Sequence, residues 1–235
     1  MPGRRLSGAL AAGAPLAAAA YALPAPAPVS ATARRALGLR ASVAGARAVA
    51  LTFDDGPHAE GTPAVLEALD AAGARATFFL VGEQVERRPS LAAEIAAAGH
   101  EVALHGQTHR SHLRLRPRAV ADDLKRGTAA LVAATGRSPR LHRPPYGLYS
   151  AASLRLVRRR DLEPVLWSLH GRDWSRRATA SSIAARLGAG LAAGEVLLLH
   201  DADHYAAPGS WRRTAAALPR LLDALADAGL EPGRI

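Results

Sequence analysis

Five short polar motifs lie between Thr52 and His200, and each follows a stretch with the apolar pattern of a buried strand. They supply carboxylates, imidazoles and a guanidinium, which are the groups that hydrolysis by a metal-activated water requires. In chain order the motifs are Thr52-Phe53-Asp54-Asp55-Gly56-Pro57, His105-Gly106-Gln107-Thr108-His109, Arg143-Pro144-Pro145-Tyr146-Gly147, Asp173-Trp174 and Leu197-Leu198-Leu199-His200.

A divalent metal site is predicted by the first two motifs. Asp54 and Asp55 are neighbouring carboxylates that repel, so a fold that keeps them together needs a cation or an arginine nearby. A surface turn is the alternative, but it does not account for two acids directly after an apolar strand. His105 and His109 are four residues apart, a spacing that places both rings on one side of a helix or tight loop. Two imidazoles and one carboxylate suit zinc, and they tolerate cobalt, nickel or manganese.

The later motifs contain candidates for acid and oxyanion chemistry. Arg143 precedes two prolines, which fix the backbone and would present the N–H of Tyr146 or Gly147 to an oxyanion. A structural turn is the alternative for this motif. His200 ends the most apolar strand, where it is either a satisfied core histidine or a general acid that Asp173 orients and charges.

The chain has three tryptophans, at positions 167, 174 and 211. Trp174 follows Asp173, and Trp211 closes the segment from Gly209. Both are candidates for stacking on a sugar ring, with a packing role as the alternative for each.

The composition excludes several classes of protein. Hydrophobic residues make up 49% of the 235 residues, which is enough for one large domain with a substantial core. The chain has no cysteine, so any metal must use His, Asp or Glu. The net charge is +10, but six arginines precede the first acidic residue, Asp54, and no basic block is interleaved with aromatics. We therefore expect no nucleic-acid binding, and we expect a monomer.

The start of the chain has the pattern of a targeting segment. Arg4 and Arg5 precede an apolar stretch, and Ala20-Tyr21-Ala22 is a candidate cleavage site. Residues 1–22 are therefore predicted to be a secretory signal or, alternatively, a retained N-terminal anchor that tethers the protein to a membrane. Residues 23–45 are rich in Pro and Ala and predict a flexible linker. Residues 46–235 then form the domain of a secreted or cell-envelope protein.

Strand and helix patterns alternate through this domain, which predicts an α/β fold with a parallel sheet or barrel and helices outside. The expected strands are Ala48–Phe53, Ala76–Val81, Glu101–Leu104, Arg140–His142, Pro164–Leu169 and Val196–Leu199. The expected helices are Pro63–Ala72 with Thr62 as N-cap, Leu91–Ala98, Pro117–Ala134, Ala151–Arg159, Ser181–Leu187 and Trp211–Asp227, the last kinked or split by Pro219. All five motifs then fall at the carboxyl ends of strands, where such folds place their active sites.

Taken in order, the motifs resemble those of the polysaccharide deacetylase family, whose members include chitin and peptidoglycan N-deacetylases and acetylxylan esterases. The resemblance runs from about Ala48 to Leu222, and the TFDDGP and RPPYG motifs are its most specific matches. It implies a distorted (β/α) barrel of parallel strands with the active site at their carboxyl ends.

The resemblance also implies a role for each residue of the motifs. Asp54 corresponds to the general base, and Arg143 to the arginine that holds it. Asp55, His105 and His109 correspond to the metal ligands. The remaining residues serve the oxyanion, the leaving group and the acetyl pocket: Tyr146 through its backbone N–H, His200 as the acid, Asp173 as the residue that tunes it, and Leu198 and Trp174 as walls.

Two departures concern the substrate. His170 stands where many members have Asp, and Gly106 stands where Ser or Thr is common. The loop from Asp203 to Trp211 is expected to form a specificity lid. The implied function is metal-dependent removal of acetyl from an amide, or from an ester, on a glycan. The alternatives are an acetyl-ester hydrolase acting on xylan or a small acylated metabolite, and a non-catalytic glycan-binding module.

Overall fold

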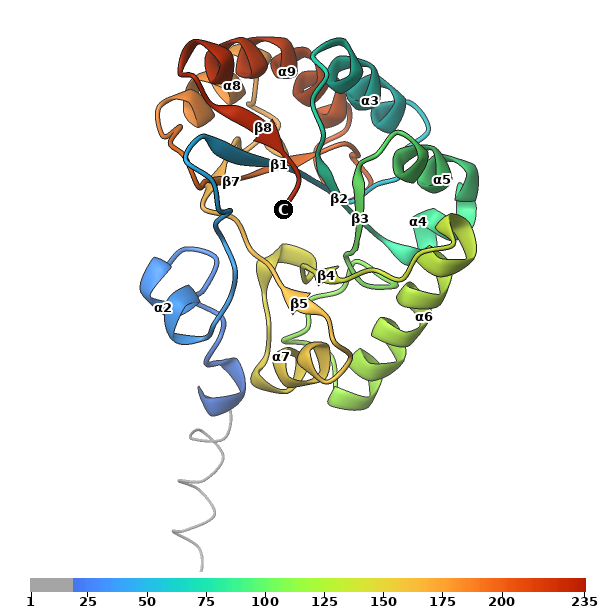
Figure 1. The fold of residues 1–235 in the computed structure, drawn as a ribbon. Helices are drawn as coiled ribbons and strands as arrows, with labels where there is room; N and C mark the ends of the chain where they lie inside the picture. Colours follow the sequence, from blue (N-terminus) through green and yellow to red (C-terminus); the bar gives the residue numbers. More distant parts are fainter. Residues whose placement is uncertain (1–18) are drawn as a thin grey trace, which may run out of the picture.

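The computed structural model describes residues 19–235, which form parallel strands curled into a half-barrel with helices around the outside (Figure 1). This is the fold that the alternating pattern predicts. Residues 1–18, which carry most of the expected secretory signal, lie outside the described residues. Among residues 19–235, no helix has both the length and the apolar character of a membrane span.

The sheet is built outward from the strand that carries the first motif, β1 (Ala48–Asp54). On one side the order is β2 (Thr77–Leu80), β3 (Glu101–Leu104), β4 (Leu141–His142) and β5 (Glu163–Pro164). On the other side lie β7 (Val196–His200) and then β6 (Leu169–His170), while β8 (Glu231–Gly233) pairs with the start of β1. Because these strands are all parallel, their carboxyl ends meet at one rim of the half-barrel.

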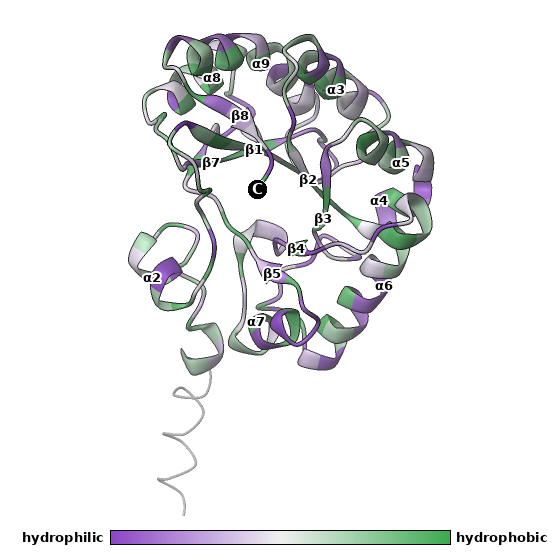
Figure 2. Ribbon diagram, in the orientation of Figure 1, coloured by the Kyte–Doolittle hydropathy of each residue, from purple (hydrophilic) through white to green (hydrophobic). Residues whose placement is uncertain are grey.

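Helices connect the strands and cover the outer face of the sheet (Figure 1). The longer ones are α3 (Gly61–Ala71), α5 (Pro89–Ala97), α6 (Pro117–Thr135), α7 (Ala151–Arg158), α8 (Ala180–Gly188) and α9 (Ser210–Asp227). Shorter ones are α2 (Ala31–Ala36), α4 (Gly82–Arg87) and the 3-10 turn η1 (Pro145–Gly147). In Figure 2, β1 is hydrophobic along most of its length, whereas the helices carry both hydrophobic and hydrophilic residues, as expected of a layer between core and water.

The C-terminal end of the described residues lies inside the curved sheet. Ile235 packs against a small apolar cluster that includes Phe79 and Val165, and its backbone N–H donates to Thr77 Oγ1 at 3.1 Å. Figure 1 accordingly places the C-terminal end at the centre of the strands. The last residue of the chain is therefore part of the packing that supports the strands beneath the motifs.

Some expected boundaries are wrong. The predicted strand Pro164–Leu169 is divided between β5 and β6, which are the first and last strands in the order of the sheet. Pro219 neither splits nor ends α9, whose neighbouring Leu218, Leu221 and Leu222 are buried, so packing outweighs the lost hydrogen bond. Thr62 lies inside α3 and is not its N-cap, and its hydroxyl donates to Asp201 and accepts from His58 N at 2.8 Å.

The segment expected to be a flexible linker, residues 23–45, is packed on the domain. It contains α2, and its Ala27 and Leu39 are buried in the main core. Arg40 donates its backbone N–H to Pro164 O at 3.1 Å and accepts from Leu166 N at 2.7 Å, and further on Val43 N donates to Gly194 O at 3.0 Å. We call residues 23–45 the N-terminal strap, because its last residues bridge the chain after β5 and the chain before β7.

Candidate active site

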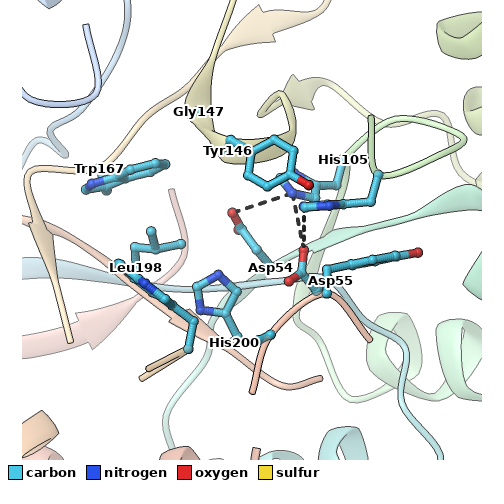
Figure 3. Close-up of a pocket in the computed structure, with 12 residues that line it drawn as sticks. Asp54, Asp55, His105, Tyr146, Gly147, Trp167, Leu198 and His200 are labelled. Carbon is cyan, nitrogen blue, oxygen red and sulfur yellow. Dashed lines mark ion pairs between the residues drawn. The ribbon is translucent and has the colours of Figure 1, made fainter. Parts of the chain in front are cut away.

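The motifs converge on one pocket of about 360 Å³ at the carboxyl rim of the sheet (Figure 3). Of the residues that the sequence predicts for the site, eight line this pocket, namely Asp54, Asp55, His105, His109, Tyr146, Trp174, Leu198 and His200. Arg143 and Asp173 are fully buried and reach the site through hydrogen bonds to pocket residues. Segments distant in the sequence thus supply one continuous wall.

Strand register explains this convergence. Asp54 at the end of β1 is paired with His200 at the end of β7, so the two side chains leave adjacent strands at the same level. On the other side, His105 N donates to Leu80 O at 2.9 Å and Arg143 N donates to Leu104 O at 3.0 Å, which continues the ladder one residue past β3 and β4. Asp54 and His200 are therefore the last residues of their strands, and His105 and Arg143 are the first residues beyond theirs.

The turn after β1 is shaped by a buried carboxyl. Asp55 has a φ of 81°, a left-handed conformation that is costly for a residue with a side chain and is often found at functional sites. A Cβ on Gly56 would lie 2.4 Å from Asp201 Oδ2, so only glycine fits between the turn and that carboxyl. Thr62 Oγ1 donates to the same Asp201 oxygen. This packing shapes the turn that carries Asp55.

Asp55 faces both imidazoles of the second motif. Its Oδ1 lies 3.4 Å from His105 Nε2 and 3.3 Å from His109 Nε2, and this buried oxygen accepts no hydrogen bond within the described residues. His105 Nδ1 lies 2.8 Å from the carbonyl oxygen of Arg143. A carbonyl only accepts, so Nδ1 carries the proton and Nε2 of neutral His105 offers a lone pair toward Asp55. Two acceptors facing each other in a buried site call for a cation between them.

This arrangement fits a divalent metal. Ligands about 2.0–2.2 Å from a tetrahedral ion are themselves roughly 3.3–3.6 Å apart, which agrees with both distances from Asp55 Oδ1. Burial lowers the pKa of His109 to about 4, so its ring is neutral and able to ligate. Burial alone would raise the pKa of Asp55, but the neighbouring imidazoles His105, His200 and His109 lower it to about 2. Asp55, His105 and His109 are thus the residues that would hold the ion.

Asp54 is held by a buried arginine. Arg143 Nη1 donates to Asp54 Oδ1 at 2.6 Å and to Thr52 Oγ1 at 2.8 Å, and its Nη2 donates to Leu166 O at 3.3 Å. The guanidinium carbon lies 4.0 Å from the centre of the Phe79 ring, a cation–π contact. One oxygen of Asp54 is therefore occupied by Arg143, while the other, Oδ2, is 3.9 Å from His105 Nε2 on the metal side.

His200 is oriented by Asp173. The imidazole Nδ1 lies 3.0 Å from Asp173 Oδ1, while Asp173 Oδ2 accepts from His200 N at 2.7 Å and from Thr214 Oγ1 at 2.9 Å. Because Nδ1 donates to a carboxylate, Nε2 is the nitrogen left to face the pocket. Burial disfavours the charged ring, but Asp173, helped by Asp55 and Asp54, raises the pKa of His200 to about 10.

Aromatic rings form much of the remaining wall. Tyr146, which has a left-handed φ of 61°, and Trp174 are more than a third exposed at the pocket mouth. Trp167 and Tyr205 also line the pocket, and the sequence analysis assigned neither to the site. A Cβ on Gly147 would lie 2.6 Å from Trp167 Cη2, so this glycine lets the two segments meet. Tyr205 lies in the loop from Asp203 to Trp211, which the sequence analysis expected to form a lid, and this position was the only sequence feature that could have indicated a role at the site.

Trp211 lies outside the pocket that the other predicted substrate-binding residues line. It is 8% exposed at the start of α9, with its ring centre 5.6 Å from that of His58 and the Arg212 guanidinium over it. It is absent from the pocket lining. Trp211 lies in the first turn of α9, and its side chain packs against the start of α3.

A second cluster with metal-binding residue types, His58, Asp203 and His204, has a different role. His58 Nδ1 accepts from Gly61 N at 2.9 Å and from Glu60 N at 3.2 Å. In neutral His58 the proton is therefore on Nε2, which points at Asp203 Oδ1 at 3.3 Å. A nitrogen that carries a proton has no lone pair for a metal. This cluster instead caps α3 and ties the loop after β7 to it.

Comparisons with known proteins agree with this geometry. The sequence profile described as polysaccharide deacetylase matches residues 41–165. A chitooligosaccharide deacetylase from Bradyrhizobium sp. (strain ANU 289) is 36% identical over 199 residues, covering 80% of this chain and 89% of the relative. The crystal structure of the Bc1960 peptidoglycan N-acetylglucosamine deacetylase has a TM-score of 0.80 at 26% identity, covering 88% of this chain and 95% of that one. A family 4 acetyl xylan esterase from Clostridium thermocellum, in complex with a cobalt ion, has a TM-score of 0.71 at 27% identity, with coverages of 80% and 88%.

The chain belongs to the polysaccharide deacetylase family. Its half-barrel of parallel strands is the fold of the solved relative with the TM-score of 0.80, as the motifs implied. The protein is therefore a hydrolase, a carbohydrate deacetylase of this family.

Proposed function

We propose that this protein is a divalent-metal-dependent enzyme that removes acetyl from the nitrogen of an acetylated oligosaccharide or polysaccharide. The observation that carries the proposal is that Asp55 Oδ1 faces two imidazole Nε2 atoms at 3.3–3.4 Å in the same pocket as Asp54 and His200. The ligand set suits zinc best and tolerates cobalt, nickel or manganese. A bound cation supplies Lewis acidity, which polarises a carbonyl and makes water a nucleophile near neutral pH.

Asp54 is the general base in this proposal. Its Oδ1 is occupied by Arg143, and its Oδ2 lies on the side of His105. The buried ion pair keeps the carboxylate in one orientation, so the free oxygen is aimed at the water to be deprotonated. Among the residues with proposed chemical roles, the Arg143 side chain contacts only the base Asp54, so Arg143 is a positioning residue.

His200 is the general acid. Asp173 holds the imidazole by Nδ1 and favours its charged form, so Nε2 carries a proton into the pocket. An amine leaves poorly without a proton, whereas an alcohol leaves more readily, so a protonated His200 suits amide cleavage better than ester cleavage. This is the reason for proposing an N-acetyl substrate over an O-acetyl one.

The acetyl group is proposed to lie between Leu198 and Trp174. Both line the pocket, and Trp174 contacts the acid ring edge-on, with ring centres 5.5 Å apart. The backbone N–H of Tyr146 is the proposed donor to the oxyanion, because η1 carries this residue to the pocket mouth. Its exposed ring offers a surface for the sugar.

Substrate class and location are inferred from relatives. The names of two of them give chitooligosaccharide and peptidoglycan N-acetylglucosamine as substrates, and the third is an acetyl xylan esterase. We propose an acetylated glycan as the partner and an extracellular or cell-envelope location, with residues 1–22 as the targeting segment. Acetyl-ester hydrolysis is the second candidate, favoured by the third relative.

A single comparison tests the proposal. The purified enzyme is stripped with a chelator, reloaded with zinc, and assayed for acetate release on N-acetylated chitooligosaccharide, peptidoglycan fragments and acetylated xylan. Zinc-dependent release from an N-acetylated substrate, abolished in Asp54→Asn, is the expected result. Full activity in the stripped enzyme would contradict the metal site, and release from xylan alone would favour the ester.

A further inference from the structure

The outer nitrogens of the two metal-facing imidazoles differ in their surroundings. His105 donates its Nδ1–H to the carbonyl oxygen of Arg143 at 2.8 Å, which fixes the ring. His109 Nδ1 is also buried, yet it makes no hydrogen bond within residues 19–235. Metal-ligating histidines ordinarily have such a partner, which sets both the tautomer and the ring orientation. Some other contact must therefore orient His109.

Aromatic rings supply that contact. The Tyr205 ring is stacked on the His109 ring with their centres 4.1 Å apart and their planes at 8°. Tyr146 meets the same imidazole edge-on, with centres 4.6 Å apart and planes at 62°. A stack on one face and an edge contact leave the imidazole little freedom to turn about its Cβ–Cγ bond.

Tyr205 is itself held at its far end. Its hydroxyl donates to Glu83 Oε1 at 2.5 Å and accepts from Gln84 Nε2 at 3.1 Å, both at the start of α4. Gln84 Oε1 in turn accepts from Arg88 Nη1 at 3.1 Å. The short bond to a carboxylate is of the charge-assisted kind, which is stronger than a bond between neutral groups. The plane of the tyrosine is thus fixed by a helix and not by its own loop alone.

The loop that carries Tyr205 is anchored on both sides of it. Asp203 Oδ2 accepts from Gly209 N at 2.6 Å, and Asp203 Oδ1 lies 3.3 Å from His58 Nε2. His204 Nε2 lies 3.4 Å from the carbonyl oxygen of Pro57. The turn after β1, which carries Asp55, is thereby tied to the loop that carries Tyr205.

We propose that Tyr205 is a positioning residue for the metal ligand His109, holding its ring by stacking where no protein hydrogen bond holds its outer nitrogen. The inference rests on the metal site of the proposed function and adds a residue that the five motifs do not contain. Glu83 and Gln84 contribute to this positioning because their hydrogen bonds hold the Tyr205 hydroxyl. Tyr205 orders the ligand before the ion arrives, so its loss lowers metal affinity.

The test compares zinc affinity, measured by competition with a chromophoric chelator, across matched variants. Tyr205→Leu and Tyr205→Ala both remove the ring and are expected to weaken zinc binding roughly 10–100-fold, the usual effect of an outer-shell partner. Tyr205→Phe keeps the stack and is expected to restore most of the affinity. Trp174→Leu removes a pocket aromatic that touches no metal ligand, and it should leave zinc affinity unchanged.

A spectroscopic readout separates positioning from general loosening. With cobalt in place of zinc, the visible absorption of Tyr205→Leu should change in shape, while that of Tyr205→Phe should match the wild type. Wild-type zinc affinity and an unchanged cobalt spectrum in folded Tyr205→Leu or Tyr205→Ala would overturn the role of Tyr205 alone. A zinc affinity of Asp55→Ala equal to that of the wild type would instead overturn the metal site itself.

Discussion

Arg143 Nη1 lies 2.6 Å from Asp54 Oδ1, and the whole arginine side chain is buried beneath the pocket. Thr52 and the Leu166 carbonyl take further donors of the same guanidinium. This ion pair ties the end of β1 to the motif after β4, and it leaves one carboxylate oxygen free for chemistry.

Arg143→Lys is predicted to lower kcat on the order of 100-fold with a smaller change in KM. Lysine keeps the charge but cannot bind Asp54, Thr52 and Leu166 together, so the base is misplaced. Steady-state assays on an N-acetylated chitooligosaccharide measure the effect. Arg118→Lys changes an exposed arginine and serves as the control. Near-normal kcat in Arg143→Lys would contradict the positioning role.

His200→Ala is predicted to lower the rate of amide hydrolysis on the order of 10²–10⁴-fold, the usual contribution of a general acid. Hydrolysis of an activated acetyl ester should fall much less, because its leaving group needs no proton. The measurement is the ratio of the rate loss on the amide substrate to the rate loss on the activated acetyl ester. Equal losses on both substrates would argue that His200 binds substrate and does not act as an acid.

Removing Asp55 is predicted to remove the metal. Asp55→Ala should weaken zinc binding by more than the roughly 10–100-fold that an outer-shell partner contributes, because a direct ligand is lost. Zinc at about 100 times its Kd should raise the Tm of the wild type by roughly 5–10 °C and leave Asp55→Ala unchanged. Asp70→Ala, at an exposed carboxylate, is the control. Zinc stoichiometry that survives in Asp55→Ala would refute the ligand assignment.

Asp201 is predicted to make stability depend on pH. Burial raises the pKa of this carboxyl from 3.8 to about 7 in the folded protein. Between these values the folded state binds more protons than the unfolded state, so this group lowers the free energy of unfolding as pH rises. Asp201→Asn removes the dependence, and its stability relative to wild type should increase from about pH 4 to about pH 7, by a few kcal/mol at most.

Urea unfolding of the metal-free protein across this pH range measures the difference. The exposed Asp227→Asn is a matched control that should leave the pH profile unchanged. Parallel profiles for wild type and Asp201→Asn would show that the Asp201 carboxyl keeps its ordinary pKa.

The N-terminal strap is predicted to be part of the catalytic unit. Arg40 holds Leu166 by a backbone hydrogen bond of 2.7 Å, and the Leu166 carbonyl accepts from Arg143. A chain that begins at Ala46 should therefore have a lower Tm and a kcat reduced on the order of 10–100-fold relative to a chain that begins at Ala20. Equal Tm and kcat would restore the linker interpretation.

Local patterns were sufficient for most elements of this fold. The strand at Glu101–Leu104 has the predicted bounds, and α6 begins at the predicted Pro117. The failures have a common origin, because they depend on contacts between distant segments. Residues 23–45 look like a linker by composition, and only their fit against β5 and the chain before β7 gives them order.

The convergence of the motifs could be predicted from the sequence, because each motif lies where an apolar strand ends and parallel strands bring such ends together. Asp54, Asp55, His105, His109 and His200 could therefore be grouped without coordinates. Tyr146 and Trp174 were predicted at the site, but only the tertiary structure showed that Trp167 and Tyr205 also line the pocket. Trp211 and Tyr205 lie in the same predicted lid, yet Tyr205 stacks on His109 while Trp211 packs beside His58. Strand ends are fixed by local pattern, but the direction of a loop side chain is fixed by whichever partners the fold places beside it.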